Sequence, residues 1–62
     1  MIFLVETDKA TFKIETENEN CKVSIIDNSD GTSQVFTLNA MQCTQAATAF
    51  IEASELINLA QS

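Results

Sequence analysis

The chain has 62 residues, with nine acidic side chains against three lysines, a formal net charge of −6, and neither arginine nor histidine. Proteins that bind nucleic acid or an anionic membrane need basic side chains to meet phosphates, so this composition disfavours both functions. The apolar run at residues 2–5 is far too short for a membrane span or a signal peptide. We therefore expect one soluble cytoplasmic domain over residues 1–62, with a sheet at about 2–38 and a helix at about 40–61.

Two strands are predicted at the start of the chain. Residues 2–6 form the first, and a short polar turn separates it from a second at residues 11–17. In the second strand, Phe12 and Ile14 alternate with polar side chains at the two-residue period of a half-buried strand. These two side chains are expected to face the core.

A third strand is predicted at residues 21–27, after a polar turn at Asn18 and Glu19. Pairing outward from that turn places Ile14 opposite Val23. Both side chains then lie on the inner face of the sheet, which supports the assignment.

The fourth strand follows Asp30 and Gly31, a pair that is typical of two-residue hairpin turns because both positions tolerate positive φ. Pairing outward from this turn predicts Ile25 opposite Phe36 on the inner face. The same register sets Val23 against Leu38 and, on the outer face, Ile26 against Val35.

The helix is predicted at residues 40–61, where good helix formers dominate and neither glycine nor proline occurs. Asn39 and Gln42 have the spacing of a capping box, in which each side chain bonds the other residue's backbone N–H. At about 100° per residue, one apolar arc is centred near Phe50. Its members are Cys43, Ala46, Ala47, Phe50, Ser54 and Ile57.

The predicted fold class is α+β: a four-stranded antiparallel β-meander followed by one C-terminal α-helix packed on one face, in the order ββββα. The simplest strand order is sequential. The alternative is an exchange in which the first strand pairs elsewhere or with another chain.

No catalytic, metal or cofactor site is predicted. Without histidine, acid–base and nucleophilic chemistry lack their commonest base, and Cys43 falls on the core arc of the helix. Residues 27–31 superficially suggest a calcium loop but lack its ligand order and its closing glutamate, so a hairpin turn is the better account. Without an export signal, Cys21 and Cys43 are expected to be reduced core thiols. We predict a protein that is not an enzyme.

Acidic side chains form the first candidate binding surface. In the predicted meander, the first and third turns share one end, and the helix runs toward it. The distances between carboxylates on these elements are near those between successive phosphates of a nucleic acid. The acidic residues therefore suggest a nucleic-acid mimic that blocks a basic, nucleic-acid-handling protein. On size, charge and domain number, the chain resembles phage-encoded inhibitors of restriction or CRISPR systems, which implies a viral protein acting in host cytoplasm. Solubility alone is the other explanation of the charge. The predicted residues are Glu6, Asp8, Asp27, Asp30, Glu52 and Glu55.

Surplus apolar surface is the second candidate, and it predicts a structural or assembly subunit, or a homodimer. A helix of about 22 residues is about 33 Å long, longer than strands of about seven residues, so its last turns should overhang the sheet. Ile2, Leu4 and Met41 are further exposed apolar candidates. The predicted dimer contact is Ala49, Ala53, Leu56, Leu59 and Ala60.

Overall fold

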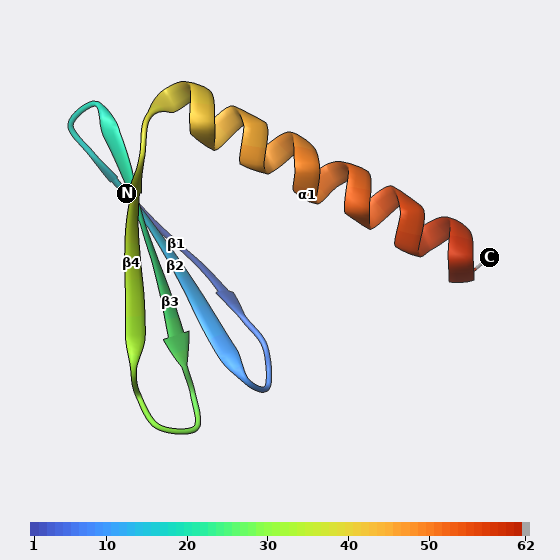
Figure 1. Ribbon diagram of the computed structural model, residues 1–62, viewed down its shortest axis with the longest axis horizontal. Coiled ribbons are helices and arrows are strands. Elements are labelled where there is room, and N and C mark those ends of the chain that lie inside the picture. Colours follow the sequence, from blue (N-terminus) through green and yellow to red (C-terminus); the bar gives the residue numbers. More distant parts are fainter. Residues whose placement is uncertain (62) are drawn as a thin grey trace.

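The computed structural model describes residues 1–61 as one antiparallel sheet followed by one helix, which confirms the predicted α+β fold. The strands lie side by side in sequential order, and the helix leaves the end of the last strand (Figure 1). The elements are β1 (Ile2–Glu6), β2 (Ala10–Glu17), β3 (Asn20–Asp27), β4 (Ser33–Leu38) and α1 (Ala40–Gln61).

The central hairpin, β2 with β3, has the predicted register, with Ile14 opposite Val23. Its turn is formed by Asn18 and Glu19, also as predicted. Asn18 has φ 54°, in the left-handed region that asparagine tolerates better than most residues. This hairpin defines the inner face of the sheet, the side on which Ile14 and Val23 lie.

The hairpin between β3 and β4 differs from the prediction. Residues 28–32 all lie outside the strands, so the turn is longer than the predicted two residues. It is closed by two backbone hydrogen bonds, from the Gly31 N–H to the Asp27 carbonyl and from the Asp27 N–H to the Thr32 carbonyl, both 2.8 Å. The predicted pairing of Ile25 with Phe36 is therefore wrong.

The observed pairing places Val23, not Ile25, opposite Phe36. The other two predicted pairs are wrong for the same reason, since Leu38 lies opposite Cys21 and Val35 opposite Ser24. The register has slipped by two residues, and because strand side chains alternate with period two, each keeps its predicted face.

The helix begins as predicted, with a capping box. The Gln42 N–H donates to Asn39 Oδ1 at 2.8 Å, and the Asn39 N–H donates to Gln42 Oε1 at 3.0 Å. Two backbone donors are thereby satisfied at the point where the chain leaves the sheet. From there α1 runs without interruption to Gln61.

The helix begins over the inner face, but it covers only part of that face. Its backbone approaches only β3 and β4, and its second half projects away from the sheet (Figure 1). Phe50, at the centre of the predicted packing arc, remains 66% exposed. Among the described residues no hydrophobic side chain is buried. A single copy of the chain therefore lacks a closed core.

Candidate functional site

An open apolar hollow of about 340 Å³ lies between the first half of α1 and the inner face. Its floor is formed by the inner side chains of β2, β3 and β4, among them Ile14, Val23 and Phe36. We call this hollow the wedge. From the helix, the wedge is lined by Cys43, Ala46, Ala47 and Phe50.

The two cysteines lie at the closed side of the wedge. Cys21 comes from β3 and Cys43 from α1; both are free and partly buried. Burial, together with a hydrogen bond to the Cys43 side chain, raises the pKa of the Cys21 thiol. A raised pKa keeps Cys21 in its unreactive thiol form at neutral pH, which fits the structural role predicted for it.

The predicted dimer residues all lie on exposed positions of α1. All five are exposed: Ala49, Ala53, Leu56, Leu59 and Ala60. Leu56 retains 67% of its accessible surface, and Ile57, on the neighbouring arc, retains 57%. The second half of α1 thus presents apolar side chains on more than one side.

The first strand carries apolar side chains on both faces. Leu4 lies opposite Lys13 on the outer face, whereas Val5 lies opposite Phe12 on the inner face. Phe3 and Val5, which were not predicted as contact residues, continue the inner face beyond the part that the α1 backbone approaches. The sequence contained this information, because successive side chains of a strand point to opposite faces and residues 2–5 are all apolar.

Four of the six predicted acidic residues share one end of the sheet. Glu6 and Asp8 lie at the β1–β2 turn, and Asp27 and Asp30 at the β3–β4 turn. The two turns are linked, because the Asn28 N–H donates to the Lys9 carbonyl at 2.9 Å and its side-chain Nδ2 donates to the Thr7 carbonyl at 3.2 Å. We call this end the acidic end.

Glu52 and Glu55 do not join the acidic end. They belong to the second half of α1, which projects away from the sheet (Figure 1). The backbone of α1 approaches β3 and β4 but not β1, so no backbone contact brings the helix to the β1–β2 turn.

Two carboxylates of the acidic end are engaged within their own turn. Asp27 Oδ1 accepts hydrogen bonds from the N–H and the hydroxyl of Ser29 at 2.9 and 2.6 Å. Asp30 Oδ1 accepts the same pair from Thr32 at 2.9 and 2.7 Å. These bonds lower the pKa of both carboxyl groups. Both acids thus have a structural reason for their position that needs no partner.

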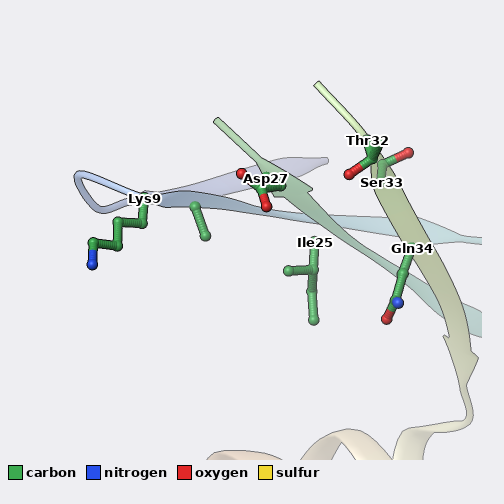
Figure 2. Close-up of a pocket in the computed structure, with 7 residues that line it drawn as sticks. Lys9, Ile25, Asp27, Thr32, Ser33 and Gln34 are labelled. Carbon is green, nitrogen blue, oxygen red and sulfur yellow. The ribbon is translucent and has the colours of Figure 1, made fainter. Parts of the chain in front are cut away.

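An open hollow of about 390 Å³ also adjoins the acidic end (Figure 2). Figure 2 shows Ile25 and its cross-strand partner Gln34 pointing to the same side of the sheet, with Asp27 near Thr32. Lys9 also lines this hollow, so a positive charge stands among the acids. The surface is therefore less uniformly negative than the sequence suggested.

Within residues 1–61 no group of histidine, cysteine, aspartate or glutamate side chains is arranged to hold a metal ion. The described helix is not long and apolar enough to cross a membrane. Comparison of the chain with protein-family models, with curated proteins and with solved structures gave no match.

Proposed function

We propose that this protein is a non-enzymatic assembly module that works through the exposed apolar side chains of α1 and through the wedge. The observation that carries the proposal is the amount of surface left open. The chain exposes 5150 Å². A compact monomer of the same mass exposes about 3,950 Å² according to the scaling of surface with mass. About 1,200 Å² per chain is therefore available for a partner.

The kind of surface supports the same function. Phe50, Ile51, Leu56 and Ile57 each keep more than half of their accessible surface. Large apolar side chains that are exposed in this number on one helix are typical of an interface. The hydrophobic effect contributes roughly 25 cal/mol per Å² of apolar surface removed from water, so covering these side chains stabilises the fold as well as the complex.

Sedimentation equilibrium at micromolar concentration tests the proposal. We expect the unmodified protein to sediment above the 6.8 kDa monomer mass. The Leu56→Glu variant is expected to shift toward monomer, because its charge has to be desolvated in the contact. The matched control replaces Glu6 by Gln and Asp8 by Asn, which removes charge at the acidic end and leaves α1 unchanged. The proposal would be overturned if the protein is a monomer at all concentrations and no other protein binds it through Leu56.

Salt separates this function from the predicted binding of a basic, nucleic-acid-handling protein. Two copies that each carry a charge of −6 repel one another, so added salt should strengthen self-association. Binding of the acidic end to a basic partner would instead weaken with salt. That partner stays a prediction, and the local hydrogen bonds of Asp27 and Asp30 make it the weaker candidate.

A further inference from the structure

We propose that the partner is a second copy of this chain and that the two copies cover each other reciprocally: the second half of each α1 lies on the partner's inner face, over β1 and β2. This inference rests on the proposed assembly function and adds where the partner lies. It would turn two open wedges into one shared core.

The uncovered part of the inner face is well defined. The backbone of α1 approaches β3 and β4 but neither β1 nor β2. Over those two strands the inner face is apolar, with Phe3 and Val5 on β1 paired to Ile14 and Phe12 on β2. Phe3 is 51% and Val5 54% exposed. The chain's own helix meets Phe12 and Ile14 only across the open wedge, and Phe3 and Val5 lie outside that wedge.

The second half of α1 has the size and pattern to cover that area. Residues 51–61 span about 17 Å at 1.5 Å per residue, and the five residues of β1 span about 17 Å. Phe50 and Ile57, seven residues apart, lie on the same side of the helix as Cys43, which lines the wedge. The arc that faces the chain's own sheet at the start of α1 therefore continues, without a sheet beneath it, in the second half.

The available area matches a dimer of this kind. About 1,200 Å² of surplus surface on each copy gives about 2,400 Å² for the pair, within the range of obligate homodimers. A two-fold axis lets both copies use the same patch, so each helix that leaves its own sheet reaches the other copy's sheet. One arrangement then covers the helix and the inner face together.

Two neighbouring residues of β1 provide a matched test by sedimentation. Val5 and Leu4 are 54% and 57% exposed and lie on opposite faces of the same strand. Val5→Glu is expected to weaken self-association by about 100-fold or more, because the partner helix would have to bury a charge. Leu4→Glu is expected to change self-association by no more than about threefold, since the outer face stays in water.

A second measurement uses the unmodified protein and so does not depend on the folding of a variant. In a mixture of isotope-labelled and unlabelled chains, we expect intermolecular nuclear Overhauser effects between the methyl groups of Ile57 and Val5. A dimer with contacts only between the two helices, or only between sheet edges, overturns the reciprocal arrangement and leaves the assembly function standing. A protein that is monomeric throughout overturns both.

Discussion

Asp27 and Asp30 each accept hydrogen bonds from the residue two positions further along the chain, Ser29 and Thr32. Such bonds fix the backbone of a turn that is longer than a tight hairpin. They also favour the ionised carboxylate, which is why the pKa of each group is lowered in the folded protein. The same two side chains thus stabilise the turn and give it its negative charge.

This arrangement predicts a loss of stability in acid. Because the pKa values of Asp27 and Asp30 are lower in the folded than in the unfolded chain, the unfolded chain takes up protons first as the pH falls. The stabilisation is complete above the ordinary aspartate range near pH 4 and is lost as the pH falls through the lowered values. Urea unfolding at a fixed protein concentration, followed by circular dichroism, should show this decline.

The control is a double variant, Asp27→Asn with Asp30→Asn. Asparagine keeps an oxygen that accepts the hydrogen bonds, but it does not titrate in this range. The free energy of unfolding of the variant should depend less steeply on pH than that of the parent. Parallel curves for the two proteins would show that these turns contribute nothing to the acid response.

Among the elements, α1 was predicted to the residue because its signals are local. Asn39 and Gln42 form the capping box, and the absence of glycine and proline carries the helix onward. The direction of α1 was not predictable in this way. After the short connection between Leu38 and Ala40, its backbone approaches only β3 and β4, and its second half projects away from the sheet (Figure 1).

The capping box predicts a measurable loss of stability. Replacing Asn39 by Ala removes the side-chain acceptor for the Gln42 N–H and should lower the free energy of unfolding by about 1 kcal/mol. Asn58→Ala, on an exposed position inside α1, is the control and should be neutral or slightly stabilising, because alanine is the better helix former. Equal effects of the two substitutions would contradict the role of the cap.

The hairpins show where sequence reasoning succeeds and where it fails. The turn at Asn18 and Glu19 has the predicted length of two residues, and its register was predicted correctly. At Asp30 and Gly31 the two-residue turn competed with a longer loop. Asp27 and Asp30 stabilise this loop by accepting hydrogen bonds from the backbone N–H groups two residues further along the chain. Each side chain of β4 still lies on its predicted face of the sheet, because the register differs from the predicted one by two residues.

At the scale of the whole molecule, the chain is extended for its length. Its radius of gyration is 13.4 Å, whereas a compact domain of this length has about 10.6 Å. The apolar surplus of the helix was visible in the sequence, but the open wedge was not. The wedge depends on the angle at which α1 leaves the sheet, and the sequence patterns of the separate elements do not give that angle.

A chain whose core is completed by a second copy should melt at a temperature that depends on concentration. Dilution favours the separated chains, and these lack buried apolar side chains, so the unfolding temperature should fall as the protein is diluted. Circular dichroism melts over about a hundredfold range of concentration measure this effect. Leu56→Glu provides the comparison, and its melting temperature should be lower and should change less with dilution. A melting temperature that is independent of concentration in the unmodified protein would contradict a shared core.

The sequential strand order has a consequence for how the protein is made. Each strand pairs with its neighbour in the chain, so the sheet needs only short loop closures and should form quickly as soon as residues 2–38 are synthesised. The helix comes last, and in the proposed dimer it completes the core only when another chain arrives, in a step whose rate depends on encounter. In that interval the nascent sheet exposes its apolar inner face and the apolar edge of β1, which are the features that draw unfinished chains into aggregates. If the core is shared as proposed, synthesis of neighbouring copies on one messenger would shorten the interval, and local production would matter more to this small acidic chain than to a domain that closes its own core.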